Sequence, residues 1–364
     1  MSGAASVSAT QHDDSIWSAV AGDPSAVQET LDFSGASLAA LEESTGVAAR
    51  MDEPASAPES DLETDALCAS IAPASFGDRV FLFPSETEAW RHAVQMLRRH
   101  HGVVGRPKRR RLIVCVGDAE GAEGAPPGLA GDEEIVVLRS DDHGALLTEI
   151  DTRTAGILIA PVRTGAGFEV VSGELLVRLR EIADEYGLIL AFDESFCGLG
   201  RSGMLWAHEW TGVTPDLMIA AHGVGEAASL TALVVTQKVT RGALGRPPSV
   251  DRAALLAGRA LMETLLAPGF LEHVQNRSWR LEDRLTALLY KHRATFAALS
   301  GLGLMQGLVC AGAAEPLRAR LAERGLLTRP MGPVLGLFPP LTVEESEIDA
   351  AVDIIEAICA EEER

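Results

Sequence analysis

Short apolar runs alternate with amphipathic helical segments over residues 76–250, and this alternation limits the possible folds more than any other feature of the sequence. The runs are apolar on both faces, which is typical of parallel strands that helices cover on both sides. A regular alternation of strand and helix predicts an α/β fold. We expect strands over residues 79–83, 111–116, 134–138, 156–160, 188–193, 217–221 and 231–236.

The segments on either side of this block differ from it in composition. Residues 1–75 contain thirteen acidic residues and one basic residue, which predicts an acidic arm or linker with little to bury. Within this arm, residues 14–20 and 29–44 are candidates for short helices. Residues 251–364 begin with a long helical region and end in an amphipathic helix. We therefore expect a large α/β domain over 76–250 and a smaller helical and α+β domain after it.

The bulk composition excludes several classes of protein. No apolar run approaches 18 residues, so we expect no membrane span, and the N-terminus lacks the features of a secretory signal. The five cysteines are scattered and have no CxxC spacing, which predicts a reduced, cytoplasmic protein without a metal site. The net charge of −21 argues against nucleic-acid binding, because phosphate recognition needs a basic surface.

One apolar run ends in an unusual residue. Residues 217–221 are followed directly by His222 and then by a glycine-containing loop. A buried parallel strand delivers a side chain in this way to a site at its carboxyl end. We therefore take His222 as a candidate catalytic residue.

The sequence GLGRSG, residues 198–203, matches the G-x-G-x-x-G pattern and follows a strand. In a dinucleotide-binding fold this motif opens a helix directly, and an acidic residue follows about 20 residues later. Here MLWAHEWTG follows instead, and the acids Asp193 and Glu194 precede the glycines. The pattern therefore does not predict a nucleotide site.

Residues 189–225, ILAFDESFCGLGRSGMLWAHEWTGVTPDLMIAAHGVG, resemble the core of class III aminotransferases. Residues 79–89, 154–167 and 335–357 resemble other parts of the same family, so the likeness covers roughly residues 76–364 in order. The family consists of pyridoxal-phosphate (PLP) enzymes of fold type I. The resemblance implies a seven-stranded, mostly parallel sheet and a dimer with its sites at the carboxyl edge of the sheet, near the subunit boundary.

The resemblance also implies roles for individual positions. Asp193 stands where the family's aspartate pairs with the pyridine nitrogen of the cofactor, and His222 stands where the family has its Schiff-base lysine. An imidazole cannot attach the cofactor covalently. The chain has only three lysines, Lys108, Lys238 and Lys291, and none lies in a loop expected at the site. We therefore expect a divergent member that lacks the covalent attachment.

Two residues stand at the family's phosphate cup. Thr87 is retained, but Glu86 replaces a glycine. The N-terminus of a helix stabilises an anion through its free N–H groups and its dipole. A glutamate at this place would satisfy those groups itself and repel a phosphate, so we expect weak cofactor binding.

Other positions differ from the family as well. Ala119 stands where a ring stacks on the pyridine, and Glu120 stands where a histidine is common. Phe196 replaces a glutamine near the cofactor, and Ser195 replaces an apolar residue. Gly336 replaces an arginine that many members use for the substrate carboxylate. Because of these differences, we expect a small polar or cationic substrate rather than an ordinary anionic amino acid.

We therefore predict a lyase- or isomerase-type enzyme that needs no cofactor and does not transaminate. Asp193 would orient His222 as a general base for an elimination, isomerisation or cyclisation in the vacated pocket. The expected pocket residues are Glu86, Thr87, Ala119, Glu120, Arg163, Glu194, Ser195 and Phe196.

Two alternatives remain open. In the first, PLP or pyridoxamine phosphate (PMP) binds non-covalently through Asp193, Thr87 and Phe196, and His222 is the base. In the second, the chain is a catalytically inactive pseudoenzyme that pairs with an active homologue. The expected assembly is a homodimer that binds a small-molecule substrate, and a heterodimer with an active homologue is the alternative assembly.

Overall fold

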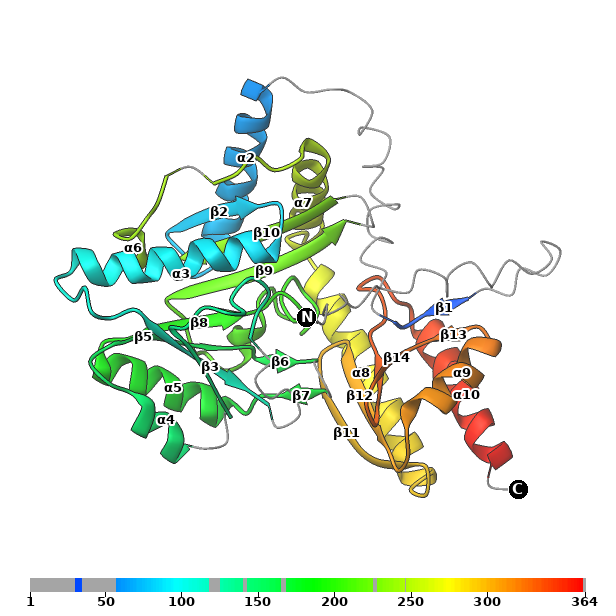
Figure 1. Ribbon diagram of the computed structural model, residues 1–364. Coiled ribbons are helices and arrows are strands. Elements are labelled where there is room, and N and C mark those ends of the chain that lie inside the picture. Colours follow the sequence, from blue (N-terminus) through cyan, green and yellow to red (C-terminus); the bar gives the residue numbers. More distant parts are fainter. Residues whose placement is uncertain are drawn as a thin grey trace, which may run out of the picture. The chain divides into compact units, whose positions relative to one another are not determined.

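The computed structural model describes residues 30–34, 57–117, 125–139, 143–164, 168–224, 228–245 and 247–362. A seven-stranded sheet carries the fold (Figure 1), and its order is β2-β10-β9-β8-β5-β3-β4. All strands run parallel except β10, which is antiparallel to both β9 and β2. The predicted α/β fold is confirmed, with β2 (Arg79–Phe83), β3 (Arg111–Val116), β4 (Ile135–Arg139), β5 (Thr154–Ile159), β8 (Ile189–Asp193), β9 (Leu217–Val224) and β10 (Ala228–Val235).

The two faces of this sheet bury alternate residues of the same strands, because side chains alternate along a strand. On β3, Leu112 packs in the cluster that contains the apolar face of α3 (Glu86–Val103). The next residue, Ile113, packs in the cluster that contains the apolar face of α5 (Gly173–Tyr186). Both faces are therefore covered, which explains why the strands are apolar on both sides.

A second, smaller sheet follows in the chain. It is antiparallel, with the order β11-β12-β15-β14. Helix α10 (Glu345–Glu362) buries Ile348, Val352 and Ile355 completely, at the spacing of one helix face. The other elements of this part are α8 (Phe270–Lys291), β11 (Phe296–Leu302), β12 (Met305–Cys310), α9 (Ala314–Glu323), β13 (Leu326–Leu327), β14 (Arg329–Met331) and β15 (Val334–Leu337).

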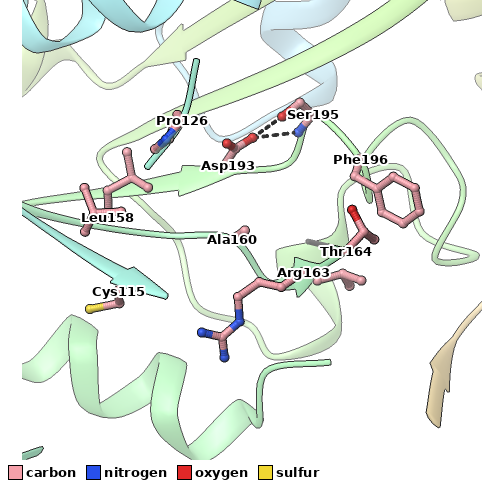
Figure 2. Close-up of a pocket in the computed structure, with 11 residues that line it drawn as sticks. Cys115, Pro126, Leu158, Ala160, Arg163, Thr164, Asp193, Ser195 and Phe196 are labelled. Atoms are coloured by element: carbon pink, nitrogen blue, oxygen red, sulfur yellow. Dashed lines mark hydrogen bonds between the residues drawn. The ribbon is translucent and has the colours of Figure 1, made fainter. Parts of the chain in front are cut away.

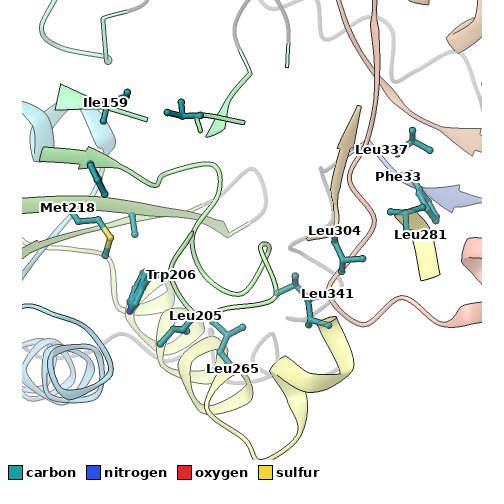
Figure 3. Close-up of a cluster of buried hydrophobic side chains, with 14 of the residues drawn as sticks. Phe33, Ile159, Leu205, Trp206, Met218, Leu265, Leu281, Leu304, Leu337 and Leu341 are labelled. Carbon is teal, nitrogen blue, oxygen red and sulfur yellow. The ribbon is translucent and has the colours of Figure 1, made fainter. Parts of the chain in front are cut away.

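One hydrophobic cluster extends from the large sheet to the small one. It includes Met218 of β9, Leu265 of α7 (Arg252–Leu265) and Leu337 of β15. Figure 3 shows part of this cluster. The two sheets are thus joined through a continuous apolar core, which fixes the loops between them.

Part of the expected N-terminal arm is packed on the rest of the chain. The prediction of a helix over residues 29–44 is wrong where the structure describes this segment. Strand β1 (Leu31–Asp32) pairs in parallel with β13, and Phe33 is only 1% exposed. This pairing with a distant strand overrides any local preference for helix. Helix α2 (Ala57–Ile71) packs on α7 and β2 and buries Leu67, whereas residues 14–20 lie outside the described residues.

The remaining elements are short. They are η3 (Ala72–Ala74), α4 (His143–Glu149), β6 (Val162–Arg163), β7 (Glu169–Val170), η5 (Ala207–Trp210) and α6 (Gln237–Thr240).

No single helix of the described residues is long and apolar enough to span a membrane. Helices α7 and α8 reach that length and composition only when they are taken together, and a bend of 76° lies between them.

Candidate active site at the carboxyl edge of the sheet

A cavity of about 170 Å³ lies at the carboxyl edge of the large sheet (Figure 2). Two lining residues that were not predicted, Ala160 and Thr164, follow directly after β5 and β6. Their positions at strand ends were the signal that could have identified them. The cavity is lined by Val114, Cys115, Pro126, Leu158, Ala160, Val162, Arg163, Thr164, Asp193, Ser195 and Phe196.

Asp193 is the last residue of β8 and lies in the cavity wall. Its carboxylate accepts hydrogen bonds from the Ser195 amide, at 3.1 Å, and from the Ser195 hydroxyl. Burial raises the pKa of Asp193, and the hydrogen bonds from Ser195 only partly oppose this effect. No cation of the described residues forms an ion pair with it. The cavity therefore presents a partly buried carboxyl group that would be stabilised by a positive ligand atom.

Glu86 and Thr87 lie in the first turn of α3. Ser85 caps this helix, because its hydroxyl accepts a hydrogen bond from the Glu88 amide at 3.3 Å. Burial raises the pKa of Glu86, and the nearby charge of Asp193 raises it further. Helix α3 begins three residues after the end of β2, at the carboxyl edge of the sheet, although Glu86 and Thr87 do not line the cavity as the sequence predicted. The helix start therefore lies at the same edge as the cavity and carries a carboxyl group that takes up a proton readily.

Glu194 does not line the cavity, although the sequence predicted it there. Its side chain is fully buried, and it accepts hydrogen bonds from the amides of Ala207 and His208, at 2.7 and 2.8 Å. The His208 ring lies at 2.8 Å from the same carboxylate. Glu194 therefore holds η5 in place, and the polar side chains that reach the cavity from this turn are those of its neighbours.

Arg163 lines the cavity and is 5% exposed. Its guanidinium donates a hydrogen bond to the Glu169 carboxylate at 2.7 Å, across the hairpin of β6 and β7. In Figure 2 the guanidinium points away from Asp193. The arginine therefore stabilises the hairpin below the cavity, and its charge is partly neutralised there.

The register of β8 and β9 separates the two predicted catalytic residues. Asp193 pairs with Ile219, and His222 lies three residues farther along β9, about 10 Å at the rise of a strand. The hydrogen bonds of the Asp193 carboxylate go to Ser195. The backbones of the two residues are thus well apart, and the predicted pairing of Asp193 with His222, directly or through water, stays a prediction. The His222 side chain, and Ala119 and Glu120 altogether, lie outside what the structure describes.

The three lysines are all described, and none lines the cavity. Lys238 forms an ion pair of 3.1 Å with Asp216, which precedes β9 at the opposite edge of the sheet. Lys291 forms an ion pair with Glu356 of α10. Lys108 lies in the loop before β3, again at the edge where the parallel strands begin.

Comparison with known proteins identifies the relatives of this chain. A family model for aminotransferase class III matches residues 129–359. The chain belongs to the class III aminotransferase family. An acetylornithine aminotransferase of Mesorhizobium japonicum is 35% identical over 306 residues, which are 79% of this chain and 76% of the relative. An acetylornithine aminotransferase of Rhodobacter capsulatus is 33% identical over 319 residues, which are 83% of this chain and 80% of the relative.

Solved structures of the same family have the same fold. The N-acetylornithine aminotransferase of Stenotrophomonas maltophilia superimposes with a TM-score of 0.74 at 25% identity, over 91% of both chains. The acetylornithine aminotransferase of Elizabethkingia anophelis gives 0.75 at 21% identity, over 91% of this chain and 90% of its own. The fold-type-I architecture of a class III aminotransferase is thus established for this chain.

These relatives contradict the predicted function. We expected a cofactor-free lyase or isomerase that does not transaminate, but the similar proteins are named aminotransferases and the family depends on PLP. The absence of the lysine at position 222 therefore cannot be taken as loss of the family's chemistry. The prediction inferred the loss of the cofactor from several substituted positions taken together. The cavity, the Asp193 carboxyl group and the start of α3 are nevertheless all present at one edge of the sheet.

The described residues fit the pyridine nitrogen of PLP, and they fit its phosphate when the Glu86 carboxyl group is protonated. Asp193 lacks a cationic partner, and a protonated pyridine nitrogen would supply one. At the start of α3 an ionised Glu86 would repel a phosphate, whereas a protonated Glu86 could donate a hydrogen bond to it. The raised pKa of Glu86 favours this protonated form. The phosphate end therefore fits when Glu86 is neutral.

Proposed function

We propose that this protein is a PLP-dependent aminotransferase whose substrate is a small amino acid of the acetylornithine type. The relatives named acetylornithine aminotransferases, at 33 and 35% identity over about four-fifths of the chain, carry this proposal. The cavity at the carboxyl edge of the sheet, with the Asp193 carboxyl group in its wall, supports it independently.

Each described residue would have a defined task in this reaction. When it is bound, PLP withdraws electrons from the carbon that carries the amino group, which makes the proton on that carbon acidic. Asp193 would hold the pyridine nitrogen in its protonated form, and Ser195 would keep the Asp193 carboxylate in position through its two hydrogen bonds. Phe196 and Leu158 form apolar walls that exclude water from the cavity.

We infer that the cofactor is held by non-covalent contacts. His222 follows the apolar part of β9 at the position where the family has its lysine, and the chain's own lysines contact Asp216 and Glu356 or lie in the loop before β3. An imidazole has an ordinary pKa near neutrality, so it is suited to take up and return a proton. His222 is therefore the proposed proton carrier of this site.

The test is a titration of the purified protein with PLP and PMP, followed by absorbance and calorimetry. We expect saturable binding of both, and conversion of bound PLP to PMP when N-acetyl-L-ornithine is added. Borohydride treatment should leave the mass of the chain unchanged if the cofactor is not attached. No binding at millimolar cofactor would contradict the proposal, and a borohydride-fixed adduct on a lysine would contradict the non-covalent mode alone.

The assembly and the location of the protein follow from the same proposal. We propose a homodimer, since sites at the subunit boundary are implied by the family resemblance, and light scattering of the purified protein tests this. All five cysteines are free, which supports a reduced compartment such as the cytoplasm. We also propose that residues 76–250 and 251–364 are the large and small domains behind the acidic N-terminal segment.

A further inference from the structure

The indole N–H of Trp90 is a buried donor without an acceptor. Trp90 lies in α3, and its side chain is only 1% exposed. No atom of the described residues accepts a hydrogen bond from its Nε1 atom. Taking a donor out of water without giving it an acceptor is unfavourable, and most buried donors are therefore bonded. Trp90 thus carries a hydrogen-bond donor that the described part of the fold does not use.

The strand pattern of β8 places this donor beside Asp193. Ala191 packs in the hydrophobic cluster that contains Trp90, whereas Phe192 packs in the cluster on the opposite face of the sheet. Asp193 follows Ala191 by two residues, so its side chain leaves the strand on the face that α3 covers. Burial raises the pKa of Asp193, and the nearby Trp90 N–H is one of the groups that act against this effect. The unused donor and the carboxyl group are therefore neighbours.

The Asp193 carboxyl group has one oxygen to spare. Both hydrogen bonds from Ser195, that of the amide and that of the hydroxyl, go to Oδ1 (Figure 2). Oδ2 accepts no hydrogen bond from the described residues. A carboxylate oxygen has two lone pairs, so Oδ2 can accept two donors at once. In the proposed function the protonated ring nitrogen of the cofactor takes one of these places, and the other remains for the Trp90 N–H.

The charge of Asp193 decides when this second place is used. Without a cationic partner, burial favours the neutral carboxyl group. A protonated ring nitrogen would favour the ionised carboxylate instead. Hydrogen bonds to an ionised acceptor are shorter and stronger than those to a neutral one. The attraction between the Trp90 N–H and Oδ2 is therefore largest when the cofactor is bound.

We propose that Trp90 is a positioning residue of the cofactor site, whose indole N–H donates a hydrogen bond to Oδ2 of Asp193 when this carboxylate pairs with the ring nitrogen of the cofactor. The inference rests on the proposed PLP-dependent function and adds a residue of α3 to it. Ser195 fixes one oxygen of the carboxylate from the turn after β8, and Trp90 fixes the other from the helix. The two contacts together set the direction in which Asp193 meets the ring.

The test compares two ligands that differ only at the ring nitrogen. One is PMP, and the other is the PMP analogue in which a C–H group replaces that nitrogen, so that it cannot pair with Asp193. Trp90→Phe keeps an aromatic ring and removes the N–H. Calorimetric titration of the full chain should show that Trp90→Phe binds PMP about tenfold more weakly than the wild type, as expected for the loss of a hydrogen bond to a charged group. Its affinity for the analogue should be unchanged.

Trp206→Phe is the matched control. Trp206 is 0% exposed and packs in the cluster on the other face of the sheet. Its indole N–H donates a hydrogen bond to the Ala74 carbonyl oxygen at 2.7 Å. Trp206→Phe loses a bond that the fold already has, so it should lower the melting temperature more than Trp90→Phe does. Its affinities for both ligands should equal those of the wild type.

The pH dependence of PMP binding gives a second readout. PMP affinity should fall at low pH as Asp193 takes up a proton, and Trp90→Phe should move this fall to higher pH, because a donor that favours the ionised form is lost. The other titratable groups described around Asp193 are Glu86 at the start of α3, and Glu194 and Cys197 in the turn after β8, and all three are unchanged in the variant. An unchanged acid limb in Trp90→Phe would contradict the inference.

A second replacement separates the N–H group from the shape of the ring. β-(3-Benzothienyl)-L-alanine at position 90 has a sulfur atom in place of the indole N–H and nearly the same outline, so it should fold as the wild type does and lose PMP affinity as Trp90→Phe does. Unchanged PMP affinity, or an equal loss for PMP and the analogue, would overturn the inference. A wild type that binds neither ligand at millimolar concentration would overturn the proposed function with it. The expected affinities without PMP formation from PLP and N-acetyl-L-ornithine would count against the proposed function alone.

Discussion

Asp193 ends β8 with a carboxyl group that accepts two hydrogen bonds from Ser195 but has no cationic partner among the described residues. Burial raises its pKa in the folded state above that of the unfolded chain. The contribution of this group to stability is therefore present at low pH and is lost as the pH rises through the folded-state pKa. A bound pyridinium nitrogen would reverse this effect.

The first prediction follows from this balance. Asp193→Asn should raise the melting temperature of the cofactor-free protein at pH 7, by roughly 2–4 °C for each kcal/mol gained, while PLP affinity falls at least tenfold. Differential scanning calorimetry and a PLP titration measure the two effects. Asp65→Asn, at an exposed position of α2, is the control and should change neither. A loss of stability in Asp193→Asn would contradict the assignment.

The second prediction concerns Glu86. Its pKa is raised, so the carboxyl group is neutral below this value and charged above it. PLP affinity should accordingly fall as the pH rises through the raised pKa, because the charged form repels the phosphate. In Glu86→Gln the affinity at neutral pH should be higher, by about tenfold, and its pH dependence should flatten. Glu174→Gln, in the first turn of α5, is the matched control; unchanged pH dependence in Glu86→Gln would refute the prediction.

Sequence reasoning predicted single residues of the site unevenly. Asp193 was identified through the family resemblance, and the structure places it at the end of β8. Glu194 was misplaced because the chain turns after β8, and the direction of a side chain in a turn depends on partners such as the His208 amide. Ala160 and Thr164 were missed, although each directly follows a strand that ends at the site.

At the scale of elements, α3 and α5 offer a matched pair of helix caps. Ser85 accepts a hydrogen bond from the Glu88 amide, and Ser172 accepts one from the Leu175 amide. Only α3 begins at the candidate site.

The third prediction uses this pair. Ser85→Ala and Ser172→Ala should each lower the free energy of unfolding by about 1 kcal/mol, because each leaves a helix amide without its acceptor. Only Ser85→Ala should also weaken PLP binding, because it disturbs the helix start that faces the phosphate. Urea denaturation and PLP titration of both variants measure this. Equal effects of the two variants on PLP binding would show that α3 does not contact the cofactor.

The seven strands of the large sheet were predictable because each is a short apolar run in the sequence. Polar or glycine-rich segments bound each run, so its start and end are visible locally. Strand β1 was not, because its two residues are extended only through their pairing with β13, almost 300 residues later. Long-range pairing of this kind leaves no periodic pattern in a short segment. The location of the cavity at the carboxyl edge of the sheet was predictable, but several of the residues that line it were not.

At the scale of the whole molecule, Phe33 joins the N-terminal part of the chain to its last third. Its side chain is 1% exposed, and its backbone amide and carbonyl bond to Leu327 and Phe338, at 2.8 Å each. Phe338 is the same residue that packs against Phe196 at the cavity. The N-terminal segment therefore supports a wall of the site from behind.

The fourth prediction tests this connection. Phe33→Ala should lower the free energy of unfolding by about 3–5 kcal/mol, because it leaves a large cavity in the core. It should also weaken PLP binding, because Phe338, which packs against the cavity residue Phe196, loses its support. Leu62→Ala, at a side chain that is 71% exposed, is the control and should have neither effect. A Phe33→Ala protein of wild-type stability would show that β1 is not part of the folded unit in solution.

The tight packing around Gly336 matters for any attempt to redesign this part of the protein. A Cβ atom at position 336 would lie 2.7 Å from the Met331 methyl carbon and 2.7 Å from the Phe338 ring, so both side chains would have to turn away before a larger residue fits. The space that a side chain at position 336 needs is thus already filled by the core of the small sheet. A larger residue there would fit best when it is combined with smaller residues at positions 331 and 338.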